Sequence, residues 1–308
     1  MSRAPTLTRR RVLASAAALP MAAVTAPVAR AAAPMMGAGT TRFNRVTLGE
    51  FEVTTLLAAT MPRPDPHSIF GLNVSEDAFN AASEAANIPT DQAQFFFTPT
   101  VVNTGSELVL FDTGLNPEGI TGALQTAGYT PDQVDVVVIT HMHGDHIGGL
   151  MGESGATFAN ARYVTSGVEF DAWAAMDNQT FEAKMRPLAE QTKMIGDGAS
   201  VASGITAMAA HGHTPGHTVY MIESGGRQLL LAADFANHYV WSLGYPDWEV
   251  KFDMDKARAA ETRRRLLGML ASDKIPFVGY HMPWPGTGYV EQAGEGYRYL
   301  STSYQLML

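Results

Sequence analysis

The sequence predicts a mixed α/β protein in which strands and helices stack in layers. Short apolar runs bounded by glycine, proline or aspartate recur along the chain, and longer amphipathic stretches lie between them. After an Ala/Gly/Pro/Thr-rich stretch at 31–41, there is no second linker, low-complexity tract or clear internal repeat. With 308 residues, of which 46% are hydrophobic and 17% charged, the chain can build a substantial core. Strands interleaved with helices in a chain without linkers indicate α/β layers.

The first half of the chain is expected to hold strands and two helices. Proline restricts the backbone, so the Pro-rich segment 61–66 is expected to be extended. Ser75 is a suitable N-cap for a helix over 75–86. The other expected elements are two short strands in 46–57 broken at Gly49-Glu50, a hairpin of 97–103 and 107–111, a helix over 117–127 and a buried strand over 136–139.

The second half continues the alternation. A long amphipathic helix is expected over 254–271, followed by an apolar strand over 275–280. Before them, the expected elements are a strand at 162–165, helical stretches at 168–175 and 181–191, and strands at 218–223 and 228–232.

The first 33 residues have the pattern of a twin-arginine export signal. Arg9 and Arg10 precede an uncharged, alanine-rich run, and small residues around 29–33 suit a signal peptidase. A membrane anchor is the alternative, but Pro20, Pro27 and the alanine content make a weak spanning helix. We therefore expect a cleaved signal at 1–33, a linker at 34–41, a catalytic domain at 42–308, and a periplasmic or secreted protein without a stable membrane anchor.

Charge and cysteine content exclude several functions. The net charge of −9 and the lack of a basic stripe in the body of the chain argue against a nucleic-acid partner. There is no cysteine, which excludes disulfides, thiolate zinc ligands, iron–sulfur clusters and a cysteine nucleophile.

The segment Thr140-His-Met-His-Gly-Asp-His146 places four potential metal ligands within six residues. It follows the apolar strand at 136–139, so the histidines stand where a strand ends and a loop begins. His141 and His143 are two apart in extended chain and point to the same side. A turn at Gly144 can then bring Asp145 and His146 back towards them. Imidazole and carboxylate together suit zinc and similar divalent ions, and the segment predicts a metal site.

Further His and Asp residues stand at other predicted strand ends. His213 lies in the tight loop Gly212-His-Thr-Pro-Gly-His217, just before a strand. Asp234, His281 and Asp112 each follow an apolar run. Each of these turns is weak evidence alone, because aspartate and glycine often end strands. Jointly they are typical of a site at one edge of a layered sheet.

Together, the His-x-His-x-Asp-His motif and the order of the later residues resemble the metallo-β-lactamase superfamily, from about residue 41 to the C-terminus. The resemblance implies a four-layer αββα sandwich with two zinc ions per chain, although other divalent metals would fit. It implies that one ion is held by His141, His143 and His213, and the other by Asp145, His146 and His281. Asp234 would bridge the two ions, and Asp112 would support the site without binding metal.

Within the superfamily, the chain is most similar to the branch of methyl parathion hydrolase and the N-acyl-homoserine lactonases. The segments that carry this resemblance are 48–52, 102–106, 141–143, 211–217 and 294–298. This branch implies an exported zinc hydrolase that acts on lactones, carboxyl esters or organophosphate triesters. We expect a small-molecule substrate of this kind, with a homodimer left open.

The expected chemistry is attack by a hydroxide that two cations about 3.5–4 Å apart share, with Asp145 as the catalytic residue that orients it. No Gly-x-Ser-x-Gly segment supports a serine nucleophile instead.

A β-lactamase is an alternative, but those enzymes generally have cysteine or serine where Asp234 stands. A glyoxalase-II-like thioesterase shares all seven ligands but adds a C-terminal helical domain, and only residues 282–308 follow His281. A flavodiiron oxidoreductase would need a flavin domain, and a non-enzymatic binding protein would be expected to have damaged ligands.

Four histidines stay outside the predicted ligand set. His217 is expected to brace the ligand loop by hydrogen bonding, and His211 to lie near that loop or on the surface. His67 has no pattern around it, whereas His238 is close enough to Asp234 to reach the rim of the pocket. Among the aromatic residues, Trp173 and Phe235 are the first candidates for an apolar substrate wall.

Overall fold

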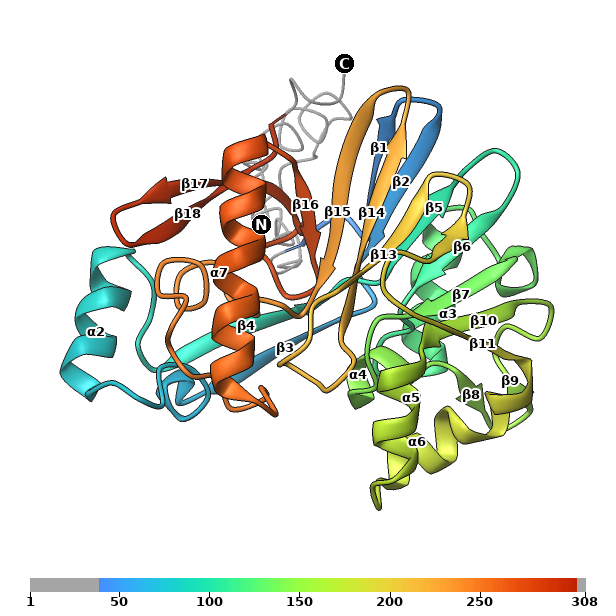
Figure 1. Cartoon of the computed structure of the whole chain (residues 1–308), viewed down its shortest axis with the longest axis horizontal. Helices are drawn as coiled ribbons and strands as arrows, with labels where there is room; N and C mark the ends of the chain where they lie inside the picture. The colour runs from blue at the N-terminus through green and yellow to red at the C-terminus, as the bar shows by residue number, and fades with distance from the viewer. Residues whose placement is uncertain (1–38, 304–308) are drawn as a thin grey trace, which may run out of the picture. The chain divides into compact units, whose positions relative to one another are not determined.

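The computed structural model describes residues 39–303 (Figure 1). Its first sheet has seven strands and is mixed. In spatial order the strands are β1 (Phe43–Leu48), β2 (Phe51–Leu56), β5 (Thr100–Asn103), β6 (Leu108–Phe111), β7 (Val136–Ile139), β10 (Arg162–Ser166) and β11 (Thr192–Ile195). The first four of these strands pair antiparallel, whereas β6, β7, β10 and β11 pair parallel.

The second sheet also has seven strands, and within it only β15 and β16 run parallel. Its strands are β12 (Ser200–Ala202), β13 (Ile205–Ala209), β14 (Thr218–Ser224), β15 (Arg227–Ala233), β16 (Phe277–Gly279), β17 (Thr287–Ala293) and β18 (Gly296–Ser301). Two small sheets complete the strands: β3 (Ala59–Pro64) with β4 (Gln92–Phe97), and β8 (Met151–Gly152) with β9 (Gly155–Ala156).

Four of the described helices cover the outer faces of the two large sheets (Figure 1). One group packs on the first sheet: α3 (Pro117–Thr126), α5 (Gly167–Ala174) and α6 (Gln179–Lys184). On the second sheet lies α7 (Lys256–Asp273). The remaining helical elements are α2 (Glu76–Ala85), the single turn α4 (Gly144–Ile147) and three short 3-10 helices, η1 (Pro66–Ser68), η2 (Pro131–Gln133) and η3 (Arg186–Gln191).

Alternation along the strands explains the layers. In β7, Val136 and Val138 pack between the sheets against side chains such as Tyr220 and Leu231 of the second sheet. Val137 points the other way, into the cluster beneath α3 and α5. Because a strand with both faces covered is apolar throughout, the run Val-Val-Val-Ile is what this central position requires. The predicted four-layer αββα sandwich is therefore confirmed.

Most predicted elements are present, and the differences have local causes. Phe97 belongs to β4, so the hairpin strand begins at Thr100. The helix predicted over 181–191 breaks into α6 and η3 before Pro187, which cannot continue the hydrogen-bond pattern. The hairpin β17–β18 was not predicted, and many of its residues are exposed or only partly buried.

The predicted signal at 1–33 and most of the linker at 34–41 lie outside the described residues. Within 39–303, none of the helices combines the length and the apolar character that crossing a membrane requires.

Candidate metal centre

The predicted metal-binding residues meet at one edge of the sandwich because of strand direction. β6, β7 and β10 are parallel neighbours, so the residues after them emerge at the same edge. In the second sheet, β15 and β16 are also parallel and end there, whereas β14 begins there. The amide of Thr218, at the start of β14, donates to the carbonyl oxygen of Thr140 over 3.1 Å and joins the two edges. Segments distant in sequence thus supply one site.

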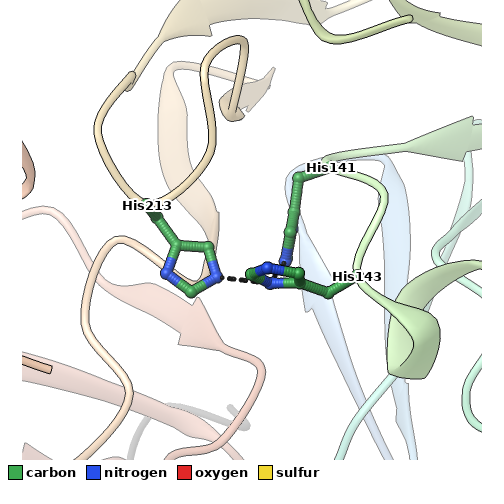
Figure 2. A group of neighbouring side chains, drawn as sticks. All are labelled: His141, His143 and His213. Atoms are coloured by element: carbon green, nitrogen blue, oxygen red, sulfur yellow. Dashed lines mark hydrogen bonds between the residues drawn. The ribbon is translucent and has the colours of Figure 1, made fainter. Parts of the chain in front are cut away.

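Three imidazoles form a first group, made of His141, His143 and His213 (Figure 2). Nδ1 of His143 lies 3.1 Å from Nε2 of His141 and 3.0 Å from Nε2 of His213. All three nitrogens face one another from the ends of two different loops. His141 and His213 are buried, whereas His143 is partly exposed.

Hydrogen bonds behind the rings determine which nitrogens face inward as acceptors. The Thr140 hydroxyl donates to Asp112 over 2.8 Å, so it accepts from Nδ1 of His141 at 3.1 Å. Nδ1 of His213 donates to Asp253 over 2.9 Å. In the neutral form of either ring, Nε2 then carries a lone pair that points at His143. Lone pairs converging in this way repel one another unless a proton or a cation lies between them.

A second group consists of Asp145, His146, Asp234 and His281. Nε2 of His281 lies 3.3 Å from Oδ2 of Asp145 and 3.2 Å from Oδ2 of Asp234. Nε2 of His146 lies 3.6 Å from Oδ2 of Asp145 and 3.4 Å from Oδ1 of Asp234. Most of these distances are longer than a good hydrogen bond, although the groups are held face to face.

Asp234 faces both groups. Its Oδ2 lies 3.5 Å from Nε2 of His213 and 3.9 Å from Nε2 of His141, besides its contacts with the second group. Asn237 donates to the same oxygen from Nδ2 over 2.9 Å and steadies the carboxylate. The carboxylate is thus placed where a bridging ligand would be needed.

The electrostatics of the two groups differ. Burial lowers the pKa of His141 well below its ordinary value and lowers the pKa of His143 to about 3, so both rings are neutral. Burial would also lower the pKa of His281, but Asp234 and Asp145 outweigh it and raise that pKa to about 10. The pKa of His146 is likewise raised well above its ordinary value, because nearby carboxylates outweigh burial. In the absence of a metal, protons supply the positive charge that the carboxylates need.

The donor set fits a pair of divalent metal ions. Among the described residues, Nε2 of His146 and Oδ1 of Asp234 are buried without a hydrogen-bond partner, which is costly unless something binds them. Two donors bound to zinc at ~2.1 Å in tetrahedral geometry lie about 3.4 Å apart, close to the separations found in both groups. Neutral imidazole and carboxylate are ligands that zinc accepts. The role of each residue as a ligand stays a prediction, but the structure brings all seven together as two groups.

Asp112 and His217 lie behind the centre, as the sequence suggested. Oδ2 of Asp112 lies 2.8 Å from Nδ1 of His146, and its Oδ1 accepts the amide of Thr140 at 2.9 Å. His217 contacts the carbonyl oxygen of Ala210 through Nδ1 and accepts the amide of Asp234 at Nε2, both over 3.1 Å. With both nitrogens bonded, His217 braces the loop, as predicted.

Glu169 is a supporting residue that sequence reasoning missed. Its buried carboxylate accepts four hydrogen bonds: from Met142 N at 3.0 Å, Trp173 Nε1 at 2.6 Å, Thr214 Oγ1 at 2.8 Å and Gly216 N at 2.7 Å. It therefore ties the segment of His141 and His143 to the loop of His213. The approach is so close that a Cβ at Gly216 would lie 2.2 Å from the amide nitrogen of Glu169.

Aromatic rings surround the two groups, but the set differs from the expected one. Trp173 is buried and lies edge-on to His143, with ring centroids 5.6 Å apart. Phe95 and Phe97 lie edge-on to His281 at 5.3 and 5.4 Å. The expectation that Phe235 lines the pocket is wrong: it packs on Phe277 in the core beneath α7.

The other three histidines lie apart from both groups. His67 stacks on Phe79, and His211 contacts Arg258 of α7 through Nδ1. His238 stacks on Trp241 and shares the lining of a cavity of about 510 Å³ with His281, which places it near the back of the centre.

Comparison with known proteins agrees with this arrangement. The family model of the metallo-beta-lactamase superfamily matches residues 98–276, which include six of the seven grouped residues and end shortly before His281. N-acyl homoserine lactonase AiiA of Bacillus thuringiensis subsp. kurstaki is 28% identical over 166 residues, covering 52% of this chain and 61% of that protein. An N-acyl homoserine lactonase of a Bacillus species is 30% identical with the same coverage. The chain thus spans about three fifths of the length of these relatives.

Two solved structures have similar folds. AidC, a dizinc quorum-quenching lactonase with a bound product, superposes with a TM-score of 0.77 at 25% identity, over 85% of this chain and 98% of that chain. The hydrolase AbOPH superposes with a TM-score of 0.77 at 22% identity, over 87% and 99%, which supports the fold alone. With a family model matching more than half of its residues and a four-layer sandwich carrying the two His/Asp groups at one edge, the chain belongs to the metallo-beta-lactamase superfamily.

Proposed function

We propose that the protein is a dinuclear zinc hydrolase that opens lactones and cleaves uncharged carboxyl esters, with organophosphate triesters as further substrates. The observation that carries the proposal is the position of Asp234, whose carboxylate faces both the three-histidine group and the second group. His141, His143 and His213 would hold one ion, Asp145, His146 and His281 the other, and Asp234 both.

When bound, the two metal ions would supply Lewis acidity at the carbonyl or phosphoryl oxygen and a hydroxide nucleophile at neutral pH. The chain's own residues orient this chemistry. Asp145 has the most exposed side chain of its group, at 22%, and its Oδ2 lies between His146 and His281. The Tyr280 hydroxyl donates to the carbonyl oxygen of Asp145 over 2.6 Å and anchors its backbone. On this proposal, the Asp145 carboxylate accepts a proton from the nucleophile and delivers it to the leaving alkoxide.

Three observations support this substrate class. The rings near the centre, Trp173, Phe95 and Phe97, are apolar. The net charge of −9 disfavours anionic substrates. The relatives and AidC are lactonases by name. Ring-opening of a lactone and hydrolysis of an open-chain ester share one step, attack on a carbonyl carbon, so a single centre can serve both.

We further propose that the protein works outside the cytoplasm, on small molecules and without nucleic acid, as an exported enzyme. This part rests on the twin-arginine pattern at 1–33, which lies outside the described residues.

A side-by-side measurement of kcat/KM on an acyl lactone, an aryl ester, a phosphotriester and a cephalosporin tests the proposal. The lactone and the aryl ester are expected to be the best substrates. A cephalosporin hydrolysed at least tenfold faster than every other substrate would replace the proposal with a β-lactamase.

A further inference from the structure

A 22-residue segment without a helix or strand, which we name the cap loop, connects β15 to α7 over residues 234–255. It begins with Asp234, and near its other end Phe252 lies 37% exposed. The ring of Phe252 is edge-on to Phe95 at 6.4 Å, and Phe95 is edge-on to His281 at 5.3 Å. The cap loop therefore leaves the centre at one end and returns beside it at the other.

Arg263 of α7 lies beneath this loop and is fully buried. Its guanidinium donates to the carbonyl oxygens of Phe235 at 3.1 Å, Pro246 at 2.7 Å and Trp248 at 3.4 Å. One side chain thus holds three separate residues of the cap loop by hydrogen bonds to their carbonyl oxygens. A loop without internal ladders needs such partners for its buried carbonyl groups.

Another donor of this guanidinium is used on Asp253. Nη2 of Arg263 donates to Oδ2 of Asp253 over 2.8 Å, and both side chains are almost completely buried. The other carboxylate oxygen, Oδ1, accepts from Nδ1 of His213 at 2.9 Å. Asp253 therefore neutralises a buried cation on one side and orients a predicted metal ligand on the other.

The backbone reinforces this link. Met254 N donates to the carbonyl oxygen of His213, and Asp255 N to that of Gly212, each over 2.9 Å. Gly212 has φ +126°, and a Cβ there would lie 2.3 Å from the amide nitrogen of Ala259 in α7. The turn that carries His213, the end of the cap loop and the first turn of α7 are consequently packed as one unit.

We propose that Asp253 and Arg263 are positioning residues that couple metal binding at the three-histidine group to the order of the cap loop. His213 would hold a metal ion through Nε2 while its Nδ1 donates to Asp253, and Asp253 accepts from the guanidinium that binds the loop. In the other direction, an ordered cap loop presents His213 in the tautomer that binds metal. The inference rests on the proposed zinc site and adds a link between that site and the loop beside it.

The test compares zinc-free and zinc-loaded full-length protein by hydrogen–deuterium exchange of peptides from the cap loop, and measures zinc affinity by competition with a chromogenic chelator. In the unaltered protein, zinc is expected to slow exchange across 236–255. Asp253→Asn should break the link, because its amide turns a donor towards either Arg263 or His213. We expect it to weaken one of the two zinc sites by about 10- to 100-fold and to leave cap-loop exchange fast with zinc present.

Arg263→Met and Arg265→Met form a matched pair on α7. Arg265 donates to the carbonyl oxygen of Ala209, which lies outside the cap loop. Arg263→Met should weaken zinc binding and speed exchange, whereas Arg265→Met should do neither. Should Arg263→Met fail to fold, the comparison of zinc-free with zinc-loaded unaltered protein still decides.

The outcomes separate this inference from the proposed function. If the unaltered protein takes up two zinc ions but shows equal cap-loop exchange with and without them, the coupling is wrong and the hydrolase proposal stands. If Asp253→Asn binds zinc with unchanged affinity, the coupling is likewise wrong and the hydrolase proposal stands. If the unaltered protein binds no zinc at all, the proposed function itself fails.

Discussion

The carboxylate of Asp112, which follows β6, fixes the orientation of the His146 ring. Nδ1 of His146 lies 2.8 Å from Oδ2 of Asp112, and both side chains are almost completely buried. This contact leaves Nε2 of His146 facing the other members of the second group. That nitrogen has no hydrogen-bond partner among the described residues. Partners behind a metal-binding histidine set its tautomer and its orientation.

Replacement of Asp112 by asparagine should therefore weaken one zinc site. The amide would turn a donor towards either His146 or Thr140, whose groups both donate to the native carboxylate. We expect zinc affinity at that site to fall about 10- to 100-fold in chelator competition. Asp135→Asn is the control, since Asp135 accepts the amide of Leu108 away from the centre. Equal affinities in the two variants would contradict the role given to Asp112.

Glu169→Gln should cost both stability and metal binding. A glutamine side chain has one acceptor oxygen where the carboxylate has two. Its NH2 group would therefore face two of the four donors that surround the native carboxylate. Leaving buried donors unpaired should lower the free energy of unfolding by about 2–3 kcal/mol in urea denaturation. Trp173→Phe keeps a ring but loses one donor, so its loss should be smaller, about 1 kcal/mol. A Glu169→Gln variant as stable as the unaltered protein would show that the carboxylate does not tie the two loops together.

The contrast between Asp234 and Glu169 shows what the sequence could predict. Asp234 follows an apolar run that ends in a turn, and parallel strands bring such turns to one edge, so the position was visible from pattern and strand direction. Glu169 sits in the first turn of α5, and its partners Met142 and Gly216 are 27 and 47 residues away in sequence. No local periodicity marks such contacts, so they appear only after the sheets are assembled.

The contacts of the cap loop and the direction of the Phe235 ring were hidden for a related reason. Asp253 lies in a segment that has no regular period, and its partner Arg263 looks like any charged residue of an amphipathic helix. Phe235 follows Asp234 directly, so it seemed close to the substrate, yet its ring turns into the core against Phe277. Proximity in sequence to a ligand does not tell which way a side chain points after a turn.

The proposed export signal leads to a prediction about where the protein is found in the cell. Replacement of both Arg9 and Arg10 by lysine should leave the precursor in the cytoplasm, because the paired arginines are the feature read for export in folded form. Fractionation followed by immunoblotting would locate the protein. Lysine keeps the positive charge, so a block would report on the arginines themselves, and unaltered export would refute the twin-arginine assignment.

Asp145→Ala tests whether all hydrolytic activities use one centre. With its carboxylate beside His146 and His281, Asp145 is expected to handle the proton in every reaction of the proposed set. Turnover of lactone, aryl ester and phosphotriester should fall together by at least about 10²-fold, in line with the contribution of a general acid or base. Survival of one activity at its original rate would assign that activity to a different site.

The most direct test of the central claim is the metal content of the purified protein, measured by elemental analysis after zinc supplementation, with and without Asp234→Ala. Because Asp234 faces both groups, the unaltered protein should hold close to two zinc ions per chain, and the variant should lose affinity for both. Retention of no more than one ion by the unaltered protein would contradict the dinuclear centre. Two tightly held ions in the variant would contradict the bridging role of Asp234.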